Sequence, residues 1–202
     1  MKYLAIDIGN VICKVDFTKF YARISKDFNL SEFEIERFLY RAQKPHDLGI
    51  LNIKGELAQS FNIKSEALLE DYMKLWDETI SPNIIVMDFL NRLISDDCKI
   101  ALLSNMGSEH AKVIPRLFSY YDLYIKFLSC EVGAQKPTLL YYKTFLDMHP
   151  EFKGCLYVDD RQENLDMGKQ FGFQGFHFDL DQLKTTPNIA KKLNEIKDLL
   201  NK

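Results

Sequence analysis

Short, continuous apolar runs separated by longer segments of helical periodicity constrain the fold of this chain most strongly. Runs of this length are typical of strands buried on both faces rather than of amphipathic helices. Strands that alternate with helices predict a parallel, doubly wound sheet of the α/β class. The predicted strands cover residues 3–8, 99–103, 124–128, 155–158 and 175–178.

A long helical segment separates the first strand from the rest of the predicted core. Residues 16–80 carry only helical patterns, with expected helices at 16–28, 31–42, 55–61 and 65–78. A crossover between parallel strands needs far fewer residues, so we expect the surplus to form a small cap above the strand ends. We therefore predict a core of residues 1–15 and 81–202 and an all-helical cap of residues 16–80.

Local signals mark the ends and the buried face of these helices. Ser31 with Glu34 forms a capping box at the start of the second cap helix. Ser81 before Pro82 predicts the start of the next core helix, since Ser can cap and Pro fits the first helical position. The expected hydrophobic core of the cap contains Trp76, Phe33, Phe38 and Leu39.

The composition narrows the class of partner. The net charge of −3 leaves no basic surplus for a nucleic-acid backbone, so we expect a small molecule as the partner. The chain reaches Asp7 too early for a secretory signal, and no apolar run approaches the ~18 residues of a membrane span. We expect a cytoplasmic protein without a membrane segment. The four cysteines have no C-x-x-C spacing, which predicts reduced, partly buried thiols.

Polar residues follow the predicted strands at the points where chemistry is expected. In a parallel sheet the carboxyl ends of the strands meet at one edge, and ligands bind there. The residues at these points are Asp7, Ser104 with Asn105, Lys136, and Asp159 with Asp160. Two adjacent carboxylates directly after a buried strand repel each other unless a cation joins them. The acidic pair therefore predicts a metal ion at this edge.

These residue types fit phosphoryl transfer to a carboxylate. Asp7 is the expected nucleophile, and the charge of Lys136 would offset the repulsion between this carboxylate and a phosphate dianion. The Ser104 hydroxyl and nearby N–H groups would bind phosphoryl oxygens. Mg²⁺ prefers oxygen ligands, and the expected ligands are Asp7, the Gly9 carbonyl oxygen, Asp160 and, directly or through a neighbour, Asp159. The expected phosphate contacts are Gly9, Asn10, Ser104, Asn105 and Lys136.

In this order the residues resemble the four motifs of the haloacid dehalogenase superfamily, with Asp7 in the first, Ser104 in the second, Lys136 in the third and Asp159-Asp160 in the fourth. The resemblance implies a Rossmann-like core with a helical cap inserted after the first strand, Mg²⁺ as cofactor and an aspartyl-phosphate on Asp7. The segment Asp7-Ile8-Gly9-Asn10-Val11 is similar to a bacterial branch of sugar-phosphate phosphatases that includes glucose-1-phosphatases. The expected activity is hydrolysis of small phosphate monoesters.

Gly9 departs from the family pattern. Most phosphatases of the family carry at this position an Asp that protonates the leaving alcohol, and such acid-base help contributes roughly 10²–10⁴ in rate. Three explanations stay open. The substrate could have a good leaving group, such as the anomeric oxygen of a sugar 1-phosphate. Asp16, His46 or Asp47 could replace the missing acid. Catalysis could also have decayed, which would leave a phosphate-binding or regulatory protein.

Two related reactions are less favoured. Dehalogenases of this superfamily lack the second Asp as well, but they do not keep the acidic pair found here. Phosphonate hydrolysis is harder to exclude and stays an alternative, because that branch of the superfamily also has a small residue after the nucleophile and keeps the acidic pair. It would need a Schiff-base lysine in the cap, and the context of Lys44, Lys54 and Lys64 predicts solvated surface instead.

We expect different environments for His46 and His110. Pro45 and Gly49 flank His46 and are expected to interrupt the cap helices, which predicts a loop where His46 could contact substrate. His110 has no paired spacing with another histidine and is expected on the surface or in a loop.

Overall fold

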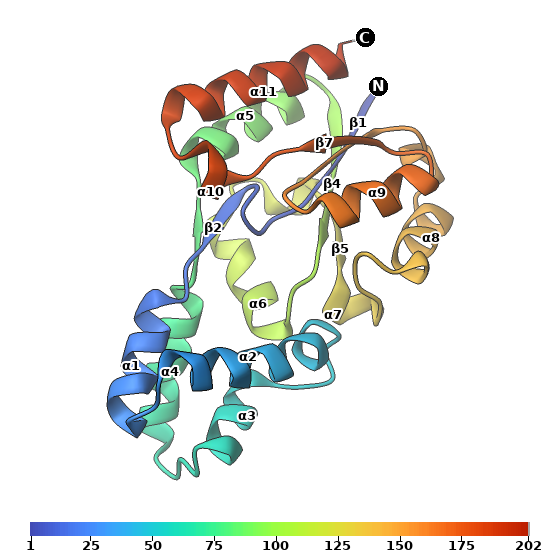
Figure 1. The fold of residues 1–202 in the computed structure, drawn as a ribbon. Helices are drawn as coiled ribbons and strands as arrows, with labels where there is room; N and C mark the ends of the chain where they lie inside the picture. The colour runs from blue at the N-terminus through green and yellow to red at the C-terminus, as the bar shows by residue number, and fades with distance from the viewer. Residues whose placement is uncertain (202) are drawn as a thin grey trace.

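Five parallel strands form the sheet that the apolar runs predict (Figure 1). The computed structural model describes residues 1–201. The strand order is β5-β4-β1-β6-β7, and every neighbouring pair is parallel, which confirms the predicted α/β class. The strands are β1 (Lys2–Ile6), β4 (Cys98–Ser104), β5 (Ile125–Leu128), β6 (Leu156–Asp159) and β7 (Gln174–His177).

Helices cover both faces of the sheet because successive strand side chains point to opposite sides. Leu4 and Ile6 of β1 join one hydrophobic cluster, whereas Ala5 joins the other. The first cluster packs α5 (Ile84–Ser95), α6 (Ser108–Leu117), α10 (Leu180–Leu183) and α11 (Thr186–Leu200) against the sheet. The second packs α8 (Leu139–Met148), α9 (Gln162–Gln170) and the 3₁₀ turn η2 (Pro150–Phe152). Shorter connectors are η1 (Tyr121–Leu123) and α7 (Ser129–Val132).

A two-stranded antiparallel ribbon carries the chain out of the core and back. It pairs β2 (Cys13–Val15) with β3 (Ile80–Pro82), and Lys14 lies opposite Ser81. The predicted helix start at Ser81 is therefore wrong. Helix α5 begins after Asn83, whose side chain accepts hydrogen bonds from the N–H groups of Ile85 and Val86. Asn caps a helix as well as Ser does, and pairing with β2 already uses Ser81.

Between β2 and β3 lies a four-helix insertion with its own hydrophobic core (Figure 1). Its helices are α1 (Thr18–Phe28), α2 (Glu32–Asp47), α3 (Ile53–Ser60) and α4 (Glu66–Asp77). Trp76 is buried in this core, and the capping box of Ser31 and Glu34 is formed as predicted. The boundaries of the cap at residues 16 and 80 stay a prediction, because the positions of the strands and helices do not by themselves define where the core ends and the cap begins.

Helix α2 is longer than predicted, and one residue that was expected on its buried face is exposed. It runs through Pro45 to Asp47, so His46 lies in a helix and not in the predicted loop. Pro45 has no N–H and leaves out one helical hydrogen bond, yet the helix continues for two more residues before it ends. Phe33 was expected in the core of the insertion but is 70% exposed, because it points away from the cluster that buries Ile35.

Within residues 1–201, no helix combines the length and the apolar character that crossing a membrane requires. All four cysteines are free thiols, as predicted, and three of them are buried.

Candidate active site

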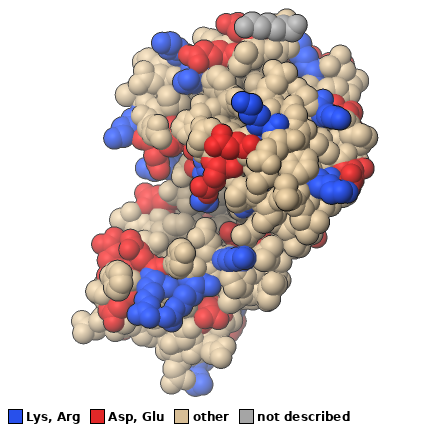
Figure 2. All heavy atoms as spheres, turned by 45° about the vertical axis from the view of Figure 1, so that its right-hand side comes forward, with Lys and Arg blue, Asp and Glu red and all other residues tan. Residues whose placement is uncertain are grey.

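A cavity of about 740 Å³ lies between the carboxyl edge of the sheet and the four-helix insertion. Figure 2 shows the hollow between these two parts of the molecule. The edge of the sheet contributes mainly polar residues, which are Asp7, Gly9, Asn10, Ser104, Asn105, Lys136, Asp160, Arg161 and Asn164. All the predicted site residues except Asp159 line this one cavity, and Asp159 is buried directly beside it.

Lys136 links two carboxylates below the cavity. Its Nζ lies 3.0 Å from Asp7 Oδ1 and 2.7 Å from Asp159 Oδ2, and all three side chains are buried. Burial acts to lower the pKa of Lys136, but Asp159 and Asp7 outweigh it and hold the pKa above its usual value. The lysine therefore stays charged at neutral pH and fixes the Asp7 carboxylate through one oxygen, which also accepts the Ile8 N–H.

Both oxygens of Asp159 are fully used by the protein. Oδ2 accepts hydrogen bonds from Lys136 and the Tyr157 hydroxyl, and Oδ1 accepts them from the Arg161 N–H and Asn164 Nδ2. Burial acts to raise the pKa of Asp159, but Lys136 and these hydrogen bonds leave it below its usual value. A carboxylate with four donors has little capacity left for a metal ion. Asp159 thus holds Lys136 in place rather than offering a free ligand atom.

Asp160 and Asp7 have the opposite environment. Burial raises the pKa of Asp160 to about 7, with Asp7 and Asp159 adding to the effect. Burial also raises the pKa of Asp7 to about 6, although Lys136 acts against it. Ligand oxygens of Asp7, Asp159 and Asp160 can lie within 4.8 Å of one another. An excess of carboxylate charge with hard oxygen donors fits Mg²⁺, for which Asp7 and Asp160 are the available side-chain ligands.

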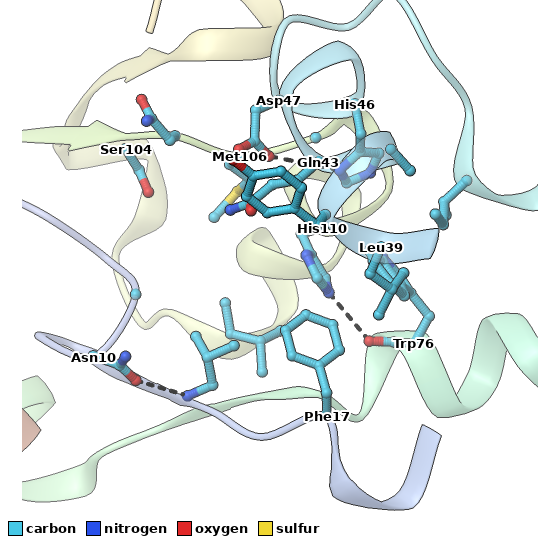
Figure 3. A pocket seen from close by; sticks show the side chains of 18 of the residues that line it. Asn10, Phe17, Leu39, Gln43, His46, Asp47, Trp76, Ser104, Met106 and His110 are labelled. Atoms are coloured by element: carbon cyan, nitrogen blue, oxygen red, sulfur yellow. Dashed lines mark hydrogen bonds and ion pairs between the residues drawn. The ribbon is translucent and has the colours of Figure 1, made fainter. Parts of the chain in front are cut away.

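Two asparagines among the predicted phosphate contacts use their side chains elsewhere. Asn105 pairs with the Lys136 backbone, since its Nδ2 donates to the carbonyl at 2.9 Å and its Oδ1 accepts the N–H at 2.8 Å. Asn10 has a φ of 51°, and its Oδ1 accepts the Val15 N–H (Figure 3). Phosphate contacts at these positions would come from backbone N–H groups. Ser104, buried at the end of β4, keeps its hydroxyl toward the cavity.

Solved structures of low sequence identity share this architecture. No protein-family model and no curated protein matches the chain. A HAD family enzyme of Bacteroides thetaiotaomicron, in complex with magnesium and inorganic phosphate, is 18% identical and superposes with a TM-score of 0.74 over 88% of this chain and 93% of that one. A HAD-like family hydrolase of Porphyromonas gingivalis is 16% identical, with a TM-score of 0.70 over 96% and 98% of the two chains.

An L-2-haloacid dehalogenase of Xanthobacter autotrophicus, with chloropropionic acid covalently bound, gives a TM-score of 0.61 at 15% identity over 96% of this chain and 83% of that one. The chain has the haloacid dehalogenase fold. In this fold, Asp7 follows the central strand β1, which lies between β4 and β6. The strand order reverses there, and open α/β sheets bind ligands at such a point.

The haloacid dehalogenase fold of this chain leaves room, but no acid, at residue 9. The φ of Gly9 lies outside the left-handed region, and an added Cβ would meet only Val15 Cγ2, at an ordinary 3.6 Å. Of the three proposed substitutes, Asp16 is exposed, accepts the Thr18 N–H and does not line the cavity. His46 and Asp47 do line it. None of the lysines considered for a Schiff base, Lys44, Lys54 and Lys64, lines it.

His46 reaches the cavity from the last turn of α2, but its ring nitrogens face carboxylates (Figure 3). Nε2 lies 3.0 Å from Glu109 Oε2, and Nδ1 lies 3.6 Å from Asp47 Oδ1. Burial acts to lower the pKa of His46, but hydrogen bonds to Asp47 and Glu109 outweigh it and raise the pKa to about 9. His46 is therefore a buried cation that joins the insertion to helix α6 of the core.

Two residues around His46 were not predicted as part of the site. His110 is buried rather than on the surface, stacks on Trp76 at 5.0 Å between ring centroids, and lies 3.1 Å from the Trp76 carbonyl (Figure 3). Burial lowers its pKa to about 4, so this ring stays neutral. Glu109 lies in the first turn of α6, where an acidic residue is favoured by the helix dipole alone. The pairing of Glu109 with His46 is visible only in the tertiary contact between α6 and α2.

Proposed function

We propose that the chain is a Mg²⁺-dependent phosphatase that hydrolyses small phosphate monoesters through an aspartyl-phosphate on Asp7. The observation that carries the proposal is the Lys136 bridge between Asp7 and Asp159, next to the unneutralised carboxylate of Asp160. This arrangement fits a nucleophile that must meet an anionic phosphoryl group. The shared fold of a family enzyme crystallised with magnesium and inorganic phosphate agrees with it.

The proposed reaction has two displacements at phosphorus. An Asp7 oxygen forms a bond to phosphorus while the ester P–O bond breaks. The electron pair of the broken bond stays on the departing oxygen. Water then attacks the same phosphorus, which releases inorganic phosphate and restores the Asp7 carboxylate. Lys136 holds Asp7 in orientation and offsets its charge, while the Ser104 hydroxyl and neighbouring N–H groups bind the phosphoryl oxygens. Bound Mg²⁺ would add a second positive charge next to the phosphoryl group.

The alternatives draw less support from the site. A phosphonatase needs a lysine in the cavity, yet Lys44, Lys54 and Lys64 lie outside its lining. A dehalogenase works without the acidic pair, whereas Asp160 lines this cavity next to Asp7. One observation still favours a phosphate-binding protein without turnover, which is that Gly9 provides no acid for the leaving group.

Phosphate release from para-nitrophenyl phosphate and a panel of sugar phosphates tests the proposal. The wild type should release phosphate only with Mg²⁺, and Asp7→Asn should lose at least about 10³-fold in rate because it removes the nucleophile. Equal rates for the wild type and Asp7→Asn on every ester would reject the hypothesis that the chain is a phosphatase. Phosphate binding that persists in both proteins would then favour the binding protein.

A further inference from the structure

Two large aromatic side chains on α2 are exposed although the insertion has a core that could bury them. Phe33 is 70% exposed and Tyr40 is 81% exposed. Neither ring packs against another aromatic ring among residues 1–201, whereas the other aromatic residues of the insertion do so. Both line the same cavity as Asp7. Exposed aromatic residues gathered on a cavity wall are typical of a binding site.

The spacing of these two residues suits a planar group between them. Seven residues make nearly two full turns, so Phe33 and Tyr40 lie on one face of α2, about 10.5 Å apart along its axis. Aromatic rings prefer centroid separations of about 4.5–7 Å, so two contacts that share one central ring span about 9–14 Å. The spacing along the helix axis would thus accommodate a single aromatic ring of a ligand between the two side chains.

The proton donors available in the cavity limit which leaving groups can depart. Residue 9 supplies no carboxylate, and both ring nitrogens of His46 face Asp47 and Glu109. A leaving group that needs little help from a proton therefore suits this site best. A phenol has a pKa near 10, as Tyr has, against about 16 for water and similar hydroxyl groups. A phenolate therefore departs unprotonated far more readily than an alkoxide.

We propose that the substrate is an aryl phosphate, with the phosphate bonded directly to an aromatic ring that lies between Phe33 and Tyr40. This inference rests on the proposed function and names its substrate class. Asp7 forms the bond to phosphorus, the bond between phosphorus and the aryl oxygen breaks, and the oxygen departs with the electron pair as a phenolate that takes its proton from solvent. Sugar phosphates offer neither the ring nor, at most positions, the leaving group.

A binding experiment tests the ring contact without turnover. In Asp7→Asn with Mg²⁺, isothermal titration should give phenyl phosphate a Kd roughly five- to 150-fold lower than that of methyl phosphate, which is the effect of two aromatic contacts. Phe33→Ala and Tyr40→Ala in that background should remove most of the difference. Leu140→Ala, which truncates a side chain 61% exposed outside the cavity, is the matched control and should retain it. Equal affinities for the two esters would reject the ring contact.

Turnover by the wild type tests the leaving group. Phenyl phosphate should react about 10²–10⁴ times faster than benzyl phosphate, which keeps the ring but releases an alcohol. Glucose 1-phosphate should fall below phenyl phosphate in kcat/KM. Rates for benzyl and phenyl phosphate within tenfold, or a preference for glucose 1-phosphate, would overturn the inference and leave the phosphatase proposal intact. No turnover of any ester above that of Asp7→Asn would reject the proposed function itself, while the titration still decides on the ring.

Discussion

Glu109→Gln should loosen the joint between the four-helix insertion and the core. Glu109 Oε2 lies 3.0 Å from His46 Nε2, and its other oxygen accepts the Ile53 N–H at 2.9 Å. Glu109 and His46 are both buried, so the pair is little screened by solvent. Removing one partner of such a pair leaves the other charge uncompensated and typically costs about 3–5 kcal/mol.

The pKa of His46 gives the size and the sign of the effect. A rise from 6.5 to about 9 corresponds to about 3 kcal/mol of stabilisation of the folded state. The folded protein keeps this proton between pH 6.5 and 9, whereas the unfolded chain releases it. The free energy of unfolding therefore falls as the pH rises through this window, by up to about 1.4 kcal/mol per pH unit. The lowered pKa of Glu109, about 2, reflects the same pair and is not an additional contribution.

Urea unfolding between pH 6.5 and 9.5 measures both quantities. Trp76 is the single tryptophan and its ring lies 5.5 Å from that of His46, so its fluorescence reports on this joint. The wild type should lose about 3 kcal/mol over the range. Glu109→Gln should start about 3 kcal/mol lower at pH 6.5 and show less than half of the wild-type slope.

A surface ion pair provides the control. Glu195 lies 3.1 Å from Lys192 at the surface, and such pairs contribute at most about 1 kcal/mol. Glu195→Gln should keep the slope of the wild type. A Glu109→Gln protein that loses less than about 1 kcal/mol, or that keeps the full pH dependence, would refute the assignment of a buried His46 cation.

Three further substitutions test other parts of the site. Gly107→Ala should cost about 1–3 kcal/mol in the same urea titration, because its Cβ would overlap the His46 ring; an unchanged midpoint would contradict this packing. Tyr157→Phe removes one of four donors to Asp159 and should cost about 1.5–3 kcal/mol by urea unfolding, whereas a neutral effect would mean that the hydrogen bond contributes nothing. Gly9→Asp should raise kcat for benzyl phosphate about 10²-fold and for phenyl phosphate far less, and equal gains on both esters would argue against a missing acid.

The parts of the site that follow strands were predictable from the sequence. A run of buried strand residues fixes where its carboxyl end lies, and parallel pairing brings those ends to one edge. Asp7 and the acidic pair thus lie together as the order of motifs indicates, whereas Lys136 reaches them from the loop between α7 and α8. The capping box at Ser31 was also predictable, since it depends only on residues three positions apart.

Features that depend on tertiary contact were not predictable in the same way. Pro45 signals a helix end, yet α2 continues because its last turn docks on the core through His46 and Asp47, whose carbonyl accepts a hydrogen bond from Ser129. Phe33 has the helical spacing of a core residue, but periodicity does not say which of two apolar faces a small bundle buries. Asn105 was predicted as a phosphate contact because it follows a strand. Its pairing with the Lys136 backbone could not be foreseen, since the two residues are 31 positions apart in the chain.

The missing acid at residue 9 and the joint at His46 have a common consequence. The two ring nitrogens of His46 face carboxylates, and the imidazolium cannot swing toward a departing oxygen without breaking its pair with Glu109. The cavity thus contains a histidine that holds the insertion against the core instead of delivering a proton. The proposed catalysis at Asp7 would then depend on the acidity of the leaving group, so the proposed aryl ester and the expected effect of Gly9→Asp rest on the same chemistry.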